Sequence, residues 1–203
     1  MKRNKSAAHR ALEMIRHHDG LIRTRDALAM GIHPRTLYTL RDEGALEPLS
    51  RGVYRLAGEE PVSNPDLVAV AIRYPKSVIC LISALAFHEL TTQVPHAMSI
   101  ALPKGSEEPR IKYPPVQAHR YSKASFESGI EQHKVDGVPI RIYCPEKTIA
   151  DCFKFRKTIG KDVILEALKL YRGRRGINVD SLLEYARICR VESTITPYLE
   201  ALL

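Results

Sequence analysis

The sequence lacks any uninterrupted apolar run that approaches the roughly 20 residues needed to cross a lipid bilayer. Its opening residues, MKRNKSAAHR, lead straight into a helical pattern without the apolar block of a secretion signal. Cysteine is scarce, and the residues at positions 80, 144, 152 and 189 form neither a CxxC pair nor a His/Cys cluster with zinc-site spacing. We therefore expect a cytoplasmic globular protein with reduced thiols, no metal, no cofactor and no membrane partner.

Positive charge is in excess. The chain of 203 residues is 44% apolar, which is enough for the core of one ordinary domain or of two small ones. It has 31 Lys and Arg against 23 Asp and Glu, a formal net charge of +8. Basic side chains release counterions when they neutralise phosphates, so this excess favours a polyanionic partner. The excess is densest in residues 1–56, with net +5 against net +3 over residues 57–203.

The N-terminal segment is predicted to begin with two helices. Residues 6–18 form the first, because apolar side chains recur there at three- and four-residue steps. Gly20 ends this helix, and residues 21–22 suit a short strand. Thr24 is a good N-cap for a second helix that extends through Met30.

A helix-turn-helix is indicated by the spacing of four residues. Two helices that cross closely need a small residue on the first, which Ala27 provides. The turn needs a residue that tolerates positive φ, which Gly31 provides. Leu37 and Leu40 follow on the next helix, where both are expected to face the core.

This second helix of the motif is predicted to read DNA. It begins near Pro34, which suits the first helical position, and Gly44 is placed to end it. Because the leucines face inward, the polar residues between them point away from the core and suit contacts with base edges and phosphates. The candidate DNA-binding residues are Arg35, Thr36, Tyr38, Thr39 and Arg41. The alternative is a solvated helix face that happens to be basic.

A basic hairpin, or wing, is predicted next. Residues 46–49 and 53–56 alternate apolar and polar side chains around Ser50-Arg51-Gly52. Arg51 at the tip would enter a minor groove or hold a phosphate, and Arg55 on the second strand would add to phosphate binding. Residues 1–56 are therefore predicted to form a winged helix-turn-helix domain.

A linker over residues 57–65, with two prolines and two glutamates, is predicted to lead into an α+β domain over residues 66–203. Asp66 is expected to cap the first helix of this domain. Strands are expected over residues 98–102, 116–121 and 138–144, which form a small sheet. Helices are expected over residues 66–74, 77–90, 145–155, 161–171 and 180–188, with a short turn after Pro197.

No set of catalytic residues is recognised. His88-Glu89 does not begin an HExxH zinc motif, because Thr92 stands where the second histidine would be. Asp151 has no second acid, base or metal-binding residue in a nuclease pattern beside it. We interpret both His88 and Asp151 as structural residues, and we do not expect an enzyme.

A second basic surface is predicted between residues 154 and 175, where eight basic and two acidic residues occur. Seven of these basic residues are its predicted members: Lys154, Arg156, Lys157, Lys161, Arg172, Arg174 and Arg175. The pattern leaves two interpretations open: a surface that binds phosphate or a partner, and an ordinary solvated face.

Three motifs, in this order, resemble those of the AbiEi-type antitoxins. They are Ser50-Arg51-Gly52-Val53-Tyr54-Arg55, Ser83-Ala84-Leu85-Ala86-Phe87-His88 and Pro145-Glu146-Lys147-Thr148-Ile149-Ala150-Asp151. The resemblance implies a type IV toxin–antitoxin regulator. Such a protein represses its own operon by binding inverted repeats in double-stranded DNA. It also counteracts a nucleotidyltransferase toxin, with which it need not form a stable complex.

Two alternatives remain open from the sequence. In one, the N-terminal domain binds DNA and the C-terminal domain senses a ligand, as in an ordinary winged-helix regulator. An apolar pocket with convergent polar groups in the C-terminal domain would support this alternative. The other makes the C-terminal domain a nuclease, against which the missing carboxylate cluster argues.

Overall fold

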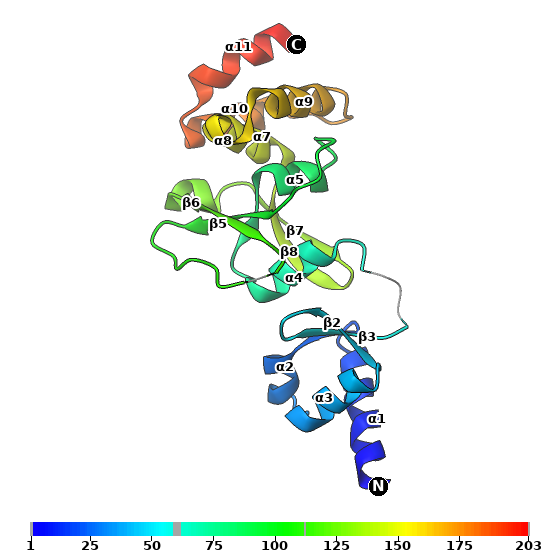
Figure 1. Cartoon of the computed structure of the whole chain (residues 1–203). Helices are drawn as coiled ribbons and strands as arrows, with labels where there is room; N and C mark the ends of the chain where they lie inside the picture. Colours follow the sequence, from blue (N-terminus) through cyan, green and yellow to red (C-terminus); the bar gives the residue numbers. More distant parts are fainter. Residues whose placement is uncertain (1, 59–61, 112, 203) are drawn as a thin grey trace. The chain divides into compact units, whose positions relative to one another are not determined.

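The computed structural model describes residues 2–58, 62–111 and 113–202, and these form two compact units (Figure 1). The first unit consists of Met1–Tyr74 and Lys134–Pro139, and the second of Pro75–His133 and Ile140–Leu203. Both units combine helices with a sheet, so the predicted α+β class is confirmed. Within the described ranges, no helix is both long enough and apolar enough to span a membrane.

The first unit has a helix-turn-helix followed by a hairpin. Its elements are α1 (Lys2–Arg16), β1 (Leu21–Arg23), α2 (Thr24–Ala29), α3 (Pro34–Asp42), β2 (Leu46–Ser50), β3 (Val53–Leu56) and α4 (Pro65–Arg73). The three strands form an antiparallel sheet in the order β1-β3-β2. Helices, turn and small sheet thus follow one another as predicted for a winged helix.

The turn between α2 and α3 is built around Gly31. Its backbone φ of +84° lies in the left-handed region that favours glycine. The amide of Gly31 donates to the Leu28 carbonyl at 3.0 Å, and that of Ile32 donates to the Ala27 carbonyl at 2.9 Å. These two hydrogen bonds together form a Schellman motif, which ends α2 and changes the direction of the chain. Ala27 is fully buried at the crossing, so both predicted roles are confirmed.

Two predicted helix caps were wrong. The N-cap of α2 is Arg23, which makes no side-chain capping bond, and Thr24 is the first residue of the helix, with its hydroxyl donating to the Gly52 carbonyl at 3.4 Å. The N-cap of α4 is Asn64, whose side-chain oxygen accepts from the Leu67 amide at 3.1 Å. Pro65 fixes this earlier start because its restricted φ suits the first helical position, and Asp66 lies inside the first turn.

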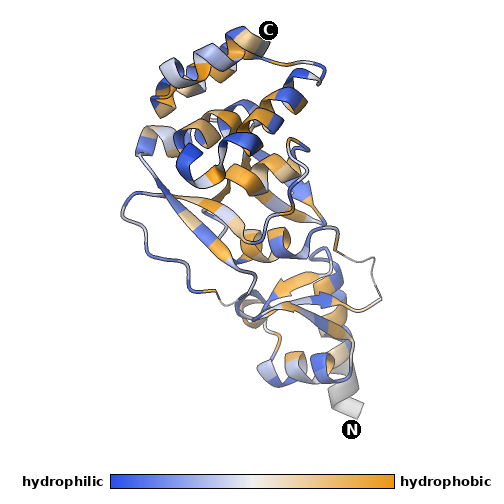
Figure 2. Cartoon of the chain, turned by 45° about the horizontal axis from the view of Figure 1, so that its top comes forward, coloured by the Kyte–Doolittle hydropathy of each residue, from blue (hydrophilic) through white to orange (hydrophobic). Residues whose placement is uncertain are grey.

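The second unit is a mixed sheet covered by helices. Its strands are β4 (Val78–Ile79), β5 (Met98–Pro103), β6 (Val116–Tyr121), β7 (Ile130–Val135) and β8 (Val138–Tyr143), in the order β6-β5-β4-β8-β7. The turn of the β7–β8 hairpin belongs to the first unit. Strand β4 runs antiparallel to β5 and parallel to β8, whereas β5 and β6 are parallel. In Figure 2 the loop between β5 and β6 is mainly hydrophilic.

The helices of this unit enclose its core. They are α5 (Leu81–Phe87), α6 (Lys123–Glu127), α7 (Pro145–Lys154), α8 (Arg156–Ile159), α9 (Lys161–Arg172), α10 (Val179–Cys189) and α11 (Glu192–Leu202). Helices α7, α9 and α10 supply much of one continuous apolar cluster. All four cysteines of the chain are reduced and buried in this unit.

Two predictions for this unit were wrong. The segment predicted as one helix over residues 77–90 contains β4 followed by α5, because residues 78–79 pair with Ala101 and Ile100 of β5. The chain after Pro197 is also more than a short turn, since Pro197 lies inside α11. Burial of Ile195 and Leu199 in the core explains why this helix forms around a proline.

Candidate nucleic-acid interface

Both ends of α3 are fixed by local bonds. The helix begins at Pro34, and the Nδ1 of His33 accepts a hydrogen bond from the Arg35 amide at 3.2 Å. It ends in a second Schellman turn, in which Gly44 has a φ of +75° and the Ala45 amide donates to the Leu40 carbonyl at 2.9 Å. The predicted start and end of this helix are therefore confirmed.

Two leucines anchor α3 and set which side chains face outward. Leu37 is 0% exposed and Leu40 is 1% exposed, and both belong to the core of the first unit. On the other faces Arg35, Tyr38 and Arg41 are exposed, while Thr36 and Thr39 are partly buried. The structure thus brings the five predicted residues together on the sides of α3 that do not enter the core.

Arg35 and Arg41 differ in their surroundings. The Arg41 guanidinium lies 5.1 Å from the centre of the Tyr38 ring and donates to Asp42 at 2.8 and 2.6 Å. The hydrogen bond that Arg41 donates to the Asp42 carboxylate raises the pKa of Arg41 above its ordinary value. Arg35 has no ion pair with any carboxylate of the described residues. Its full positive charge is available to a phosphate or a guanine.

The wing presents one of its two arginines. Arg51 is exposed at the turn between β2 and β3. Arg55 instead faces Glu47 in the β2–β3 register, and its guanidinium donates to the Glu47 carboxylate at 2.8 and 2.5 Å. The Arg55 side chain is only 19% exposed. Arg55 therefore holds the two strands of the wing together, and Arg51 is the wing cation that projects outward.

The predicted second basic surface is divided between the two ends of α9. Lys154 closes α7, Arg156 and Lys157 lie on α8, and Lys161 begins α9. Arg172 ends α9, and Arg174 and Arg175 follow it. Because α9 has 12 residues, the two groups are about 18 Å apart along the helix axis. The seven predicted residues therefore form two groups, one near each end of α9.

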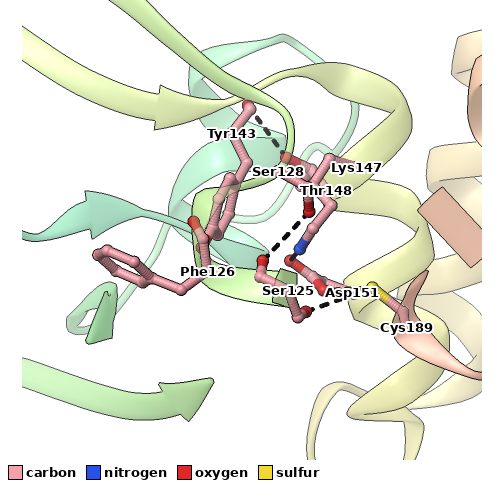
Figure 3. Close-up of polar contacts among 8 residues, drawn as sticks. All are labelled: Ser125, Phe126, Ser128, Tyr143, Lys147, Thr148, Asp151 and Cys189. Carbon is pink, nitrogen blue, oxygen red and sulfur yellow. Dashed lines mark hydrogen bonds and ion pairs between the residues drawn. The ribbon is translucent and has the colours of Figure 1, made fainter. Parts of the chain in front are cut away.

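Asp151 lies in a buried network of the second unit (Figure 3). Its carboxylate accepts a hydrogen bond from the Lys147 ammonium at 2.5 Å, and both side chains are 0% exposed. The Cys189 thiol donates to the other carboxylate oxygen at 3.1 Å. Burial raises the pKa of the Asp151 carboxyl, and the Lys147 charge partly offsets this effect. These contacts fit the structural interpretation of Asp151. The sequence analysis did not identify its partner Lys147, because a spacing of four residues indicates an ion pair on a helix but not the burial of that pair.

His88 is also structural, as predicted. It is buried at the end of α5, and its Nε2 lies 2.7 Å from the Tyr143 carbonyl, to which it donates in the matching tautomer. The Thr148 hydroxyl donates to the same carbonyl at 3.2 Å. Burial lowers the pKa of His88, which favours the neutral ring. The two later motifs of the resemblance thus meet at the end of β8.

Comparison with known proteins supports a regulatory front segment. Residues 9–57 match the family described as transcriptional regulator, AbiEi antitoxin, so the resemblance is confirmed over this range. That description is of a regulator and not of an enzyme. The fold of the chain is similar to the crystal structure of the Rv2827c protein from Mycobacterium tuberculosis, with a TM-score of 0.57 and 15% identity over 93% of this chain and 78% of that chain. No match is found among curated proteins.

Proposed function

We propose that this protein is a DNA-binding antitoxin that represses its own operon and counteracts a nucleotidyltransferase toxin. Residues 1–56 act as the DNA-binding domain, residues 57–65 as a linker, and residues 66–203 as the antitoxin domain. The observation that supports DNA binding most directly is the outward face of α3, which combines exposed Arg35, Tyr38 and Arg41 with a core-anchored opposite face. The family match over residues 9–57 supports the same role.

The side chains on α3 suit base reading in a major groove. Arg35 can donate two hydrogen bonds to a guanine, and the threonines can meet a base edge or a thymine methyl group. Tyr38 can donate to a phosphate oxygen, which fixes the register without reading sequence. Arg51 adds a phosphate or minor-groove contact from the wing. An operator with inverted repeats would present one such half-site to each bound copy.

The first test measures binding of the full chain to a labelled duplex from the region upstream of its own gene. Fluorescence anisotropy at 50 to 200 mM salt should show affinity that falls steeply with salt, as counterion release requires. The duplex should also outcompete a shuffled duplex of the same length and composition. Absence of binding at the lowest salt would refute the proposal.

Replacing Arg51 with alanine should weaken binding to the operator and to shuffled DNA by similar factors. The slope of log affinity against log salt should become shallower by about one, because one phosphate contact is lost. Lys123→Ala is the matched control, since Lys123 is an exposed cation on α6 in the other unit. If Arg51→Ala leaves the slope of log affinity against log salt unchanged, the wing tip does not contact the DNA.

Repression and antitoxicity should be separable in cells. A full-length Arg35→Ala/Arg41→Ala variant is expected to lose repression of a reporter driven by its own promoter. The same variant should still restore growth to cells that express the neighbouring nucleotidyltransferase, because the substitutions lie outside residues 66–203. If the unaltered protein fails to restore growth in this assay, the antitoxin part of the proposal is wrong, whatever the DNA-binding result.

A further inference from the structure

A cavity of about 180 Å³ opens in the second unit between α7, α8, α9 and α11. Its apolar wall includes Phe153, Ile164, Leu165 and Tyr198. The rings of Phe153 and Tyr198 meet edge to face, with their centroids 5.2 Å apart, which gives the wall a defined shape. The volume is below the roughly 300–1,000 Å³ of sites for drug-sized molecules, so the cavity suits a ligand with one small ring.

Two cations border this apolar wall. Arg156 and Lys161 both line the cavity, and none of the described residues that line it is acidic. The Arg156 guanidinium donates to the Phe153 carbonyl at 3.1 Å, which holds its charge at the edge of the cavity. Within the described part of the chain, neither cation forms an ion pair with a carboxylate. Two uncompensated positive charges beside an aromatic wall are complementary to an anion with an apolar body.

We propose that the cavity between α9 and α11 binds a small aromatic carboxylate. The ring would lie against Phe153 and Tyr198, and the carboxylate would accept hydrogen bonds from Arg156 and Lys161. A planar carboxylate fits the guanidinium fork, which can donate two parallel bonds. This site is independent of the proposed DNA binding, because every residue that forms it lies in the second unit.

Isothermal titration calorimetry of the full chain tests this site with phenylacetate as the probe. Phenylacetamide has the same ring and size without the charge, and acetate has the charge without the ring. Phenylacetate is expected to bind at least about tenfold more tightly than phenylacetamide, since charged hydrogen bonds exceed neutral ones by about that factor. Acetate should bind more weakly still. Equal affinity for the acid and the amide, or no binding of phenylacetate, would overturn the proposal.

Variants locate the binding site. Arg156→Gln and Lys161→Gln should each weaken phenylacetate binding by about tenfold, whereas binding of phenylacetamide should change little. Thr194→Phe places a ring into the cavity that Thr194 lines and should abolish binding of both compounds. The control is Lys169→Gln, an exposed cation at the far end of α9. Unchanged phenylacetate affinity in the Arg156 and Lys161 variants, with melting temperatures like that of the parent, would place the ligand elsewhere.

Discussion

Replacing Lys147 with methionine is expected to lower the free energy of unfolding by about 3–5 kcal/mol, the typical cost of removing one partner from a buried ion pair. Lys147 and Asp151 are both fully buried and bonded to each other. Methionine fills a similar volume, so the loss reflects the uncompensated Asp151 charge more than a new cavity. Urea denaturation followed by far-ultraviolet circular dichroism measures this loss.

A second variant distinguishes the effect on stability of removing the whole ion pair from the effect of leaving one buried charge without its partner. Lys147→Met/Asp151→Leu removes both charges together and should recover most of the stability lost by Lys147→Met, because a buried pair is often replaceable by apolar residues. A double variant as unstable as the single one would show that packing at position 147, and not charge, dominates.

The loss of stability in the Lys147→Met variant should depend on pH. Burial already raises the pKa of Asp151, and loss of the lysine removes the main effect that lowers it. A carboxyl whose folded pKa lies above its unfolded value of about 3.9 destabilises the fold as pH rises from that value to the folded pKa. The variant should therefore lose less stability, relative to the parent, at pH 5 than at pH 8. The opposite trend would contradict this assignment.

The Arg35→Ala/Arg41→Ala variant is expected to bind the operator about 100-fold more weakly than the parent, because each arginine that reads a base contributes about 1–3 kcal/mol. The ratio of the affinity for the operator to the affinity for shuffled DNA should fall by a larger factor than the affinity for shuffled DNA itself. Arg35 is expected to account for the greater share, because Arg41 already donates to Asp42. Competition anisotropy with operator and shuffled duplexes measures both quantities.

The matched control for this variant is Lys123→Ala/Lys169→Ala, which also removes two positive charges, but from exposed positions in the second unit. It should retain nearly all of the operator affinity. An unchanged affinity in Arg35→Ala/Arg41→Ala would refute the assignment of α3 as the reading helix. Equal losses in both variants would instead assign the effect to net charge.

The helix-turn-helix could be predicted from the sequence because its determinants are local. The small Ala27, the positive-φ Gly31 and the inward Leu37 and Leu40 act within a few turns of one another, and each occupies its predicted place. Strand β4 was missed because its two residues are held by β5, some twenty residues later in the chain. A short apolar run can suit either a strand or a buried helix, so periodicity alone could not decide between them.

The candidate interface was predictable only as far as local geometry sets it. The outward direction of Arg35 follows from the positions of the two leucines, whereas the bond between Arg55 and Glu47 depends on strand register. Burial of Lys147 depends on packing between elements distant in sequence, since Cys189 of α10 completes the contacts of Asp151. A lysine four residues before an aspartate on a helix is ordinarily solvent-exposed, so the sequence pattern did not indicate a core pair.

Chemical labelling of the buried cysteines can report transient opening of the fold. Burial raises the pKa of Cys144 and Cys189 to about 11, and it raises that of Cys80 and Cys152 further. Alkylating reagents attack the thiolate, which is scarce in such surroundings and shielded from the reagent. Labelling must therefore wait until the surrounding helices separate. Since every thiol lies in the second unit, the rate of labelling follows the opening of that unit alone, without any introduced probe.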